Sequence, residues 1–221
     1  MAPGIDIEQA RFNMIEQQIR PWGVLDSQVL QLLALVQREQ FVPAAQRALA
    51  FVDMEIPLGG GQHMLAPKVE ARLLQDLAVH KHEKVLEIGA GSGYMAALLA
   101  RRAQSVLTLE IDEGLANLGR SNLQRAGIYN VEVRHADGSS GLSAEAPFDV
   151  ILLSGSVAQA PQQLLSQLRL GGRLAAIVGE QPVMRATFIR RTGETQFQTS
   201  QRWDTVADRL RNFAEPSRFS F

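Results

Sequence analysis

Apolar residues recur every three or four positions in three stretches of the first 80 residues, which is the periodicity of an amphipathic helix. Pro21 follows the first stretch and would end that helix, and Asp26 is placed to cap the start of the second. The stretches cover residues 6–20, 27–38 and 67–77. The pattern therefore predicts a helical segment over about residues 1–80.

The pattern changes at Lys84, where short apolar runs begin to alternate with helical stretches. Strands that alternate with helices of this length form a parallel sheet covered on both faces. Residues 183–203 suit an antiparallel hairpin that closes the sheet. The expected fold is α/β, a doubly wound and mostly parallel sheet with an N-terminal helical segment and a C-terminal antiparallel hairpin. The predicted strands are KVLEIGAG, SVLTLEID, VEVRHADG, FDVILLSG and RLAAIVG, and the predicted helices are MAALLARRA, EGLANLGRSNLQRAG and APQQLLSQLRLGG.

No linker-like stretch separates the helical part from the α/β part. We divide the chain into an N-terminal segment, residues 1–80, and an α/β core, residues 81–221. Because charged and apolar residues continue through the junction without a Pro-, Gly- or Ser-rich spacer, we expect one integrated domain with a shared core.

Composition narrows the function without identifying it. The chain has 221 residues, 46% of them hydrophobic and 20% charged, with a net charge of −1, which is typical of a soluble globular protein and predicts neither nucleic-acid nor membrane-surface binding. There is no cysteine, which excludes disulfides, thiolate metal sites and a cysteine nucleophile.

The N-terminus lacks the apolar core of a signal peptide, and no apolar run approaches the roughly 18 residues of a membrane span, so we expect a cytoplasmic protein. His80, His82 and His135 show no metal-ligand spacing, and we predict no metal.

The run VLEIGAGSGY ends the first predicted strand in a glycine-rich turn formed by Gly89, Gly91 and Gly93. A dinucleotide-binding turn would need a glycine where Tyr94 stands. The pattern instead suits a nucleoside that carries an amino-acid tail, because the backbone can approach the ligand and Glu87 can orient a cationic amine. The alternative is a tight strand-to-helix turn that binds nothing.

Acidic residues end the next two predicted strands. Glu110 stands where a carboxylate can accept both ribose hydroxyls in a nucleoside-binding sheet. Asp137 and Gly138 end the third strand, where a short side chain can accept a hydrogen bond from an adenine amine. The alternatives are a surface glutamate and a bare Asp-Gly turn. Because the carboxyl ends of parallel strands lie along one edge, we expect these residues to form a single site.

Together with PFDVILLSG and LRLGGRLAAIVG, these motifs resemble the class I S-adenosylmethionine-dependent methyltransferases in order and spacing. The resemblance implies a Rossmann-like sheet, S-adenosyl-L-methionine as cofactor and S-adenosyl-L-homocysteine as product. The cofactor-binding residues that it implies are Glu87, Gly89, Ala90, Gly91, Ser92, Gly93, Glu110, Ile111, Asp137 and Gly138.

The N-terminal part narrows the resemblance to one family. MIEQQIRPWGVLDSQVLQLLALVQREQFVP, FVDMEIPLGGGQ and the following AP are similar to the protein-L-isoaspartate (D-aspartate) O-methyltransferases, and the similarity covers about residues 11–180. It implies methyl transfer to the α-carboxylate of L-isoaspartyl residues in damaged proteins. The implied partner is a protein or peptide that contains such a residue.

The chain departs from this family on the substrate side. The family's T-I-S falls on His63, Met64 and Leu65, so that Leu65 replaces the serine to which the family's active-site role is assigned. His63 and Lys68 are the candidates to supply the missing hydrogen-bond donors. The other substrate-side candidates are Gln62, Met64, Ser154 and Ser156. The family's C-terminal R-F-V-P-L pattern is not visible, and the sequence assigns no role to residues 204–221.

Three functions remain open on these residues. His63 or Lys68 preserves isoaspartyl activity, the acceptor has changed, or the chain binds S-adenosylmethionine without catalysis. His63 can also be a loop histidine without a role, and Lys68 a solvated lysine at a helix start. The sequence predicts no oligomeric state.

Overall fold

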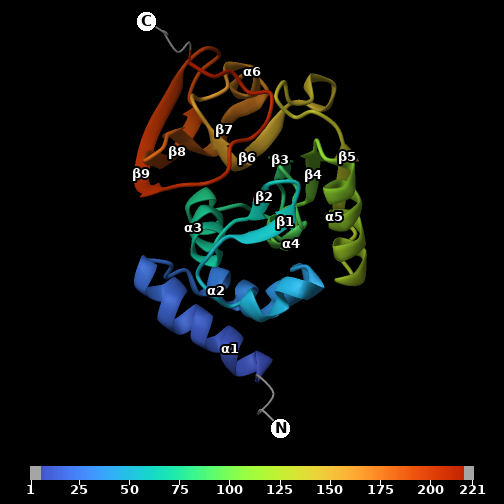
Figure 1. Cartoon of the computed structure of the whole chain (residues 1–221). Helices are drawn as coiled ribbons and strands as arrows, with labels where there is room; N and C mark the ends of the chain where they lie inside the picture. The colour runs from blue at the N-terminus through green and yellow to red at the C-terminus, as the bar shows by residue number, and fades with distance from the viewer. Residues whose placement is uncertain (1–5, 217–221) are drawn as a thin grey trace, which may run out of the picture.

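A seven-stranded sheet forms the centre of the computed structural model, which describes residues 6–216 (Figure 1). The strand order is β5-β4-β3-β6-β7-β8-β9; the first four pairings are parallel and the last two antiparallel. This confirms the predicted α/β fold and its C-terminal hairpin. The strands are β3 (Lys84–Ile88), β4 (Ser105–Glu110), β5 (Val131–His135), β6 (Phe148–Val157), β7 (Leu168–Glu180), β8 (Val183–Arg191) and β9 (Phe197–Thr205).

The two faces of the sheet are covered unequally. One face packs against α3 (Pro67–Leu77), α4 (Tyr94–Ala100) and α5 (Glu113–Arg125). The other face is covered by the four-residue helix α6 (Gln162–Leu165) and by loops. The predicted helix in APQQLLSQLRLGG is therefore wrong in its second half, where β7 begins at Leu168.

Two neighbouring glycines lie inside β7, in the stretch that was expected to be helical. Gly171 has φ +84°, which ordinary side chains rarely adopt, and a Cβ on Gly172 would lie 2.9 Å from the carbonyl oxygen of Asp149. The backbone of β7 thus comes close to β6 at this point. Pairing with a neighbouring strand outweighed the apolar periodicity of the sequence.

The N-terminal part follows the predicted helical pattern with one local change. The helix predicted over residues 6–20 begins as α1 (Ile7–Asn13) and continues as a π-helix over Met14–Ile19. Asp26 caps α2 (Ser27–Leu35) by accepting a hydrogen bond from the backbone N–H of Gln28. After α2 the chain forms a two-stranded hairpin that the sequence did not predict, β1 (Ile56–Gly59) with β2 (Gln62–Met64).

The N-terminal part and the sheet share one apolar core. Ile19 and Leu33 from the helical part belong to the same buried cluster as Val85 of β3 and Ala97 of α4. Burial of such side chains stabilises each by about 1.5–3 kcal/mol relative to exposure. Helical part and sheet therefore depend on each other for much of their apolar burial.

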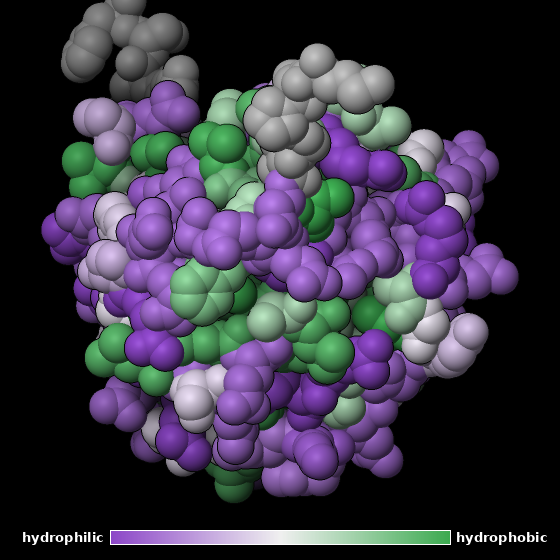
Figure 2. Space-filling view, turned by 90° about the horizontal axis from the view of Figure 1, so that it is seen from below, coloured by the Kyte–Doolittle hydropathy of each residue, from purple (hydrophilic) through white to green (hydrophobic). Residues whose placement is uncertain are grey.

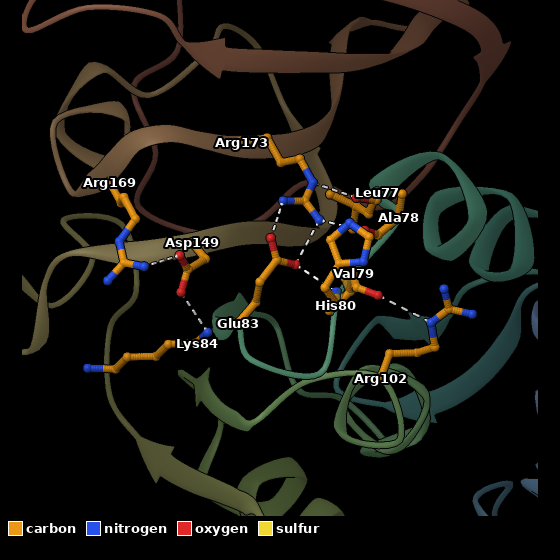
Figure 3. A network of polar contacts seen from close by, with 10 residues as sticks. All are labelled: Leu77, Ala78, Val79, His80, Glu83, Lys84, Arg102, Asp149, Arg169 and Arg173. Atoms are coloured by element: carbon orange, nitrogen blue, oxygen red, sulfur yellow. Dashed lines mark hydrogen bonds and ion pairs between the residues drawn. The ribbon is translucent and has the colours of Figure 1, made fainter.

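A polar network holds α3 to the edge of the sheet opposite the glycine turn (Figure 3). Two guanidinium nitrogens of Arg173 on β7 lie 2.7 and 2.9 Å from the carboxylate of Glu83, and one of them also donates to the carbonyl of Ala78 at the end of α3. Burial alone would raise the pKa of Glu83, but hydrogen bonds from Arg173 and from the backbone N–H of His80 lower it. The end of α3 is thus fixed to β7, the neighbour of the central strand β6.

The N-terminal helices leave apolar side chains on the outside. Figure 2 shows apolar groups in a band across the face seen from below, the side on which α1 and α2 lie in Figure 1. The exposed large apolar residues of this part include Ile7, Phe12, Trp22, Leu25 and Leu35. None of the helices in the described residues combines the length and apolar character that a membrane crossing requires.

Candidate functional site

The carboxyl ends of β3, β4, β5 and β6 surround a cavity beside the β1–β2 hairpin. The chain after β9 closes it from the other side by returning to the end of β6, where Ser156 and Arg209 form a parallel bridge (Figure 1). We call residues 207–213 the C-terminal segment. The cavity has a volume of about 60 Å³, below the roughly 300–1,000 Å³ of most small-molecule sites. In this conformation the cavity is thus smaller than a nucleoside-sized ligand needs.

The glycine turn brings bare backbone to the cavity. Gly89 and Gly91 line it and have φ values of +92° and +50°, which favour glycine. Gly93 does not line the cavity. A Cβ there would lie 3.1 Å from the carbonyl oxygen of Gly119, so Gly93 allows α4 to approach α5 closely. Of the remaining turn residues, Ala90 and Ser92 also line the cavity.

Glu110 is held in place at the end of β4. Its carboxylate accepts hydrogen bonds from the backbone N–H groups of Gly91 at 2.8 Å and of Asp112 at 3.0 Å. A carboxylate has about four acceptor positions, so others remain for hydroxyl donors in the cavity. The side chain is nearly buried, and the adjacent Ile111 also lines the cavity. This geometry suits a ribose.

Asp137 lies at the opposite end of the cavity, after β5. It accepts hydrogen bonds from the backbone N–H of Ser139 at 2.8 Å and from the side chain of Asn212 at 2.7 Å. These hydrogen bonds, the Ser139 one first, hold the pKa of Asp137 below its ordinary value. Gly138 beside it lies against Ile88, since a Cβ would come within 2.6 Å of that side chain. Asp137 is therefore an anionic acceptor that is already shared with the C-terminal segment.

Glu87 lies one layer behind the cavity wall. Its fully buried carboxylate accepts hydrogen bonds from the hydroxyls of Thr108 and Ser154, each at 2.7 Å. Burial raises the pKa of Glu87 to about 7, and the two hydroxyls oppose that shift. Of this group only Ser154 lines the cavity. Any influence of Glu87 on a ligand amine would act through Ser154 and not by the direct contact that we expected.

The β1–β2 hairpin and the residues after it form the apolar side of the cavity. Gln62, His63, Met64 and Leu65 all line it, as the sequence led us to expect. Met64 and Leu65 are nearly buried, with 4% and 5% of their surface exposed. At the position of the family serine the wall thus presents a hydrocarbon surface and no donor.

A buried ion pair fixes the backbone at Leu65. Arg38 has no exposed surface; it donates to the carbonyl of Leu65 at 2.7 Å and pairs with Glu70 of α3. Burial raises the pKa of Glu70 to about 7, against the opposing effect of Arg38. The Arg38 guanidinium also lies 5.1 Å from the centre of the Tyr94 ring, a cation–π distance. Both Glu70 and Tyr94 line the cavity, and the sequence analysis did not identify either as a site residue.

His63 is held by a carboxylate from the other end of the chain. Its Nδ1 lies 2.7 Å from Oδ2 of Asp208 in the C-terminal segment. Glu55 lies close to this pair; burial raises its pKa, the negative charge of Asp208 raises it further, and His63 opposes the shift. Asp208 thus fixes the orientation of the imidazole through Nδ1, and Nε2 is the ring nitrogen through which His63 can bond to a ligand.

The C-terminal segment runs along the mouth of the cavity. The backbone N–H of Ser156 donates to the backbone carbonyl of Asp208 at 2.7 Å. The backbone N–H of Leu210 donates to the backbone carbonyl of Ser156 at 2.9 Å. Leu210 covers the glycine turn, since a Cβ on Gly89 would lie 3.1 Å from its side chain. Leu210, Arg211 and Phe213 all line the cavity. No local pattern in the sequence indicated this, because the contacts join residues far apart in the chain.

Two expected site residues lie elsewhere. Lys68 pairs with Asp53 at 2.7 Å and lies 3.9 Å from the centre of the Trp22 ring, outside the cavity. Ser156 is fully buried, and its hydroxyl donates to the carbonyl of Ala207. Lys68 is thus not placed to hold an acceptor, and Ser156 anchors the C-terminal segment and does not form a polar rim. Within the described residues, no cluster of three or more His, Asp or Glu side chains is arranged to hold a metal ion.

Comparison with known proteins gives a consistent family assignment. A sequence model of the family described as Protein-L-isoaspartate(D-aspartate) O-methyltransferase (PCMT) matches residues 9–206. The protein-L-isoaspartate O-methyltransferase of Herpetosiphon aurantiacus is 38% identical over 193 residues, which cover 87% of this chain and 86% of that protein. Protein-L-isoaspartate O-methyltransferase 1 of Syntrophobacter fumaroxidans is 42% identical over 176 residues, 80% of this chain and 82% of that protein.

A solved structure shows the same fold. A Plasmodium falciparum protein described as a beta-aspartate methyltransferase (PCMT), in complex with S-adenosyl-L-homocysteine, superposes with a TM-score of 0.76 at 19% identity and covers 92% of this chain and 97% of that one. The family match ends at residue 206, immediately before the C-terminal segment. The wall that closes the cavity thus lies outside the part of the chain that carries the family pattern.

Proposed function

Because the chain belongs to the protein-L-isoaspartate(D-aspartate) O-methyltransferase family, we propose that it transfers a methyl group from S-adenosyl-L-methionine to the α-carboxylate of an isoaspartyl residue in a protein substrate. The observation that carries the proposal is the carboxylate of Glu110, fixed by two backbone N–H groups beside the glycine turn. Glu110 lines the cavity and keeps further acceptor positions for the hydroxyls of a ligand, inside a chain that matches the family over residues 9–206.

The cofactor side fits S-adenosyl-L-methionine in its chemistry. Glu110 would accept the ribose hydroxyls, Asp137 the adenine amine, and the backbone at Gly89 and Gly91 would lie against the amino-acid tail. S-adenosyl-L-methionine supplies a methyl group on a positively charged sulfur and is left as the neutral thioether S-adenosyl-L-homocysteine. The anionic residues of this side suit a cofactor whose reactive part is cationic.

The acceptor side has to hold and aim a carboxylate. An acceptor carboxylate is already ionised near neutral pH, so no general base is required. Met64 and Leu65 exclude water from the reacting oxygen, and Arg38 fixes the backbone that carries Leu65. The ring of His63, oriented by Asp208 through Nδ1, would hydrogen-bond to the acceptor through Nε2. Fixing the reacting atoms in line is the main source of rate in such a reaction.

A transfer assay tests the proposal. Methyl transfer from labelled S-adenosyl-L-methionine is measured on an isoaspartyl peptide and, as the matched control, on the same peptide with a normal aspartyl residue. We expect label on the isoaspartyl peptide alone. Equal labelling of both peptides, or of neither, would contradict the proposal.

Leu65 favours a second candidate, a methyltransferase of the same cofactor with another acceptor. A hydrocarbon wall at the family's serine position is compatible with an acceptor that carries less charge than a carboxylate. Tight binding of S-adenosyl-L-homocysteine without transfer to the isoaspartyl peptide would support this candidate. Transfer that appears only in a Leu65→Ser variant would indicate an intact scaffold whose acceptor has changed.

A further inference from the structure

The wall of the cavity carries three acidic side chains and one arginine. Glu70, Glu110 and Asp137 line it, and Arg211 is the only lysine or arginine among its lining residues in the described part of the chain. A carboxylate that enters a site with this charge balance needs a cationic or hydrogen-bonding partner, because leaving it unpaired costs several kcal/mol. Since Leu65 offers no hydroxyl, that partner has to come from another element.

Arg211 is available for this task, whereas its neighbours are occupied. Asp208 pairs with His63, Arg209 pairs with Glu215 at 3.0 Å, and Asn212 donates to Asp137 at 2.7 Å. Within residues 6–216 the guanidinium of Arg211 forms neither a hydrogen bond nor an ion pair. The residues on both sides of Arg211 are therefore held by side-chain contacts, while the Arg211 guanidinium is left to bind a ligand.

Arg211 both lines the cavity and is exposed to solvent, so a protein substrate outside the cavity can contact it. Leu210 packs over Gly89 and closes the glycine turn, while Arg211 is exposed at the mouth of the cavity. His63, the other donor that we assign to the acceptor, is tied to the same segment three residues earlier. Both donors thus come to the mouth of the cavity through one short stretch of chain.

We propose that Arg211 is the residue that binds the acceptor carboxylate, and that its planar guanidinium selects a carboxylate over a neutral acceptor. The assignment rests on the proposed isoaspartyl activity. Arginine suits this role because its N–H groups match a carboxylate in a bidentate geometry, which a lysine does not reproduce. The cofactor also carries a carboxylate, and the experiment has to distinguish the two sources.

The test compares two forms of the enzyme, each with two peptides that differ only at the acceptor carboxylate. Wild type and Arg211→Gln are assayed for methyl transfer to the isoaspartyl peptide, and for inhibition by the same peptide with its α-carboxylate converted to an amide. Calorimetry with S-adenosyl-L-homocysteine gives the cofactor affinity of each form. Arg101→Gln, which removes an exposed arginine at the end of α4, is the matched control. Arg211→Lys keeps the positive charge but loses the planar guanidinium that can bind a carboxylate through two N–H groups.

For Arg211→Gln we expect KM for the isoaspartyl peptide to rise at least about tenfold, since a hydrogen-bonded charge pair is commonly worth that factor or more. Binding of the amide peptide and of S-adenosyl-L-homocysteine should change less than about twofold, because neither of them loses a contact with Arg211. Arg211→Lys should recover part of the loss, and Arg101→Gln should behave as wild type.

Each other result overturns the assignment in a recognisable way. An unchanged KM in Arg211→Gln excludes Arg211 as the acceptor's partner while leaving the isoaspartyl activity in place. A loss of S-adenosyl-L-homocysteine affinity with unchanged KM assigns the arginine to the cofactor. A wild type that does not methylate the isoaspartyl peptide overturns the proposed function and this assignment with it.

Discussion

The two sides of the cavity are built in different ways. On the cofactor side, Gly91 and Glu110 are 19 residues apart, lie at the ends of neighbouring strands and hold each other through one hydrogen bond. On the acceptor side, His63 and Asp208 are 145 residues apart, and their contact depends on the C-terminal segment returning to the sheet. The first side is a property of two adjacent βα units, whereas the second exists only once the whole chain has folded.

This difference explains which side retains the family pattern. The glycine turn and Glu110 are fixed by backbone hydrogen bonds, so few other residues fit those positions. On the acceptor side a donor can come from either of two segments, and loss of one hydroxyl can be offset by a cation from the other.

The largest effect that we expect breaks the cofactor side. Glu110→Ala removes the charged acceptor of two hydrogen bonds that the ribose hydroxyls would donate, at about 1.5 kcal/mol each, which corresponds to roughly a hundredfold loss of affinity for S-adenosyl-L-homocysteine. Calorimetry measures it, and Glu113→Ala, an exposed acid at the start of α5, is the control. A loss below about tenfold would contradict the assignment of Glu110 to the ribose.

The second effect tests how deeply the cofactor side is buried. Burial raises the pKa of Glu87 from its ordinary value of 4.5, which applies in the unfolded chain, to about 7 in the folded state. The folded state thus keeps a proton that the unfolded state releases, so this group lowers the free energy of unfolding as pH rises from about 4.5 to 7. At 1.36 kcal/mol per pKa unit the upper bound is about 3 kcal/mol, and we expect about 2.

Glu87→Gln cannot lose a proton and should remove that part of the pH dependence. Urea unfolding at pH 5 and pH 8 measures it as the difference between variant and wild type, because Glu70, with a pKa of about 7, contributes in the same direction in both. Glu132→Gln is the surface control, since hydrogen bonds from Arg134 lower the pKa of Glu132. Equal pH dependence in wild type and Glu87→Gln would show that Glu87 is ionised in the folded protein at both pH values.

How much the sequence could predict follows the same division. The glycine turn, Glu110 and Asp137 were found because each lies at the end of a strand with a clear apolar pattern. Lys68 was misplaced because nothing local shows that Asp53 and Trp22 take its charge. The C-terminal segment was missed because its role depends on contacts with the glycine turn and with β6, which have no signature in residues 207–213 themselves.

The third effect concerns the contact that joins the two distant segments. Asp208→Asn keeps the size of the side chain but removes the charged partner that orients the His63 ring through Nδ1. We expect KM for the isoaspartyl peptide to rise about tenfold, the effect of losing one charge-assisted hydrogen bond, with unchanged affinity for S-adenosyl-L-homocysteine. Asp204→Asn on β9, which pairs with Arg185 at the surface, is the matched control. An equal change in cofactor affinity would mean that Asp208 only holds the segment closed over the cavity.

The smallest effect concerns Leu65, a nearly buried side chain of the acceptor side that offers no hydrogen-bond donor. If His63 and Arg211 hold the acceptor carboxylate, a hydroxyl at position 65 adds a third donor to an anion that is already bound. Leu65→Ser also removes a nearly buried side chain, which costs stability on the order of 2 kcal/mol. We therefore expect kcat/KM on the isoaspartyl peptide to stay within about threefold of wild type. That is a smaller change than the tenfold effect, about 1.4 kcal/mol, expected for loss of a needed donor. Leu58→Ser, a truncation on the same hairpin, separates the packing loss from the gain of a donor. A large gain in Leu65→Ser alone would show that the acceptor side lacks a donor, and that the C-terminal segment does not replace the serine.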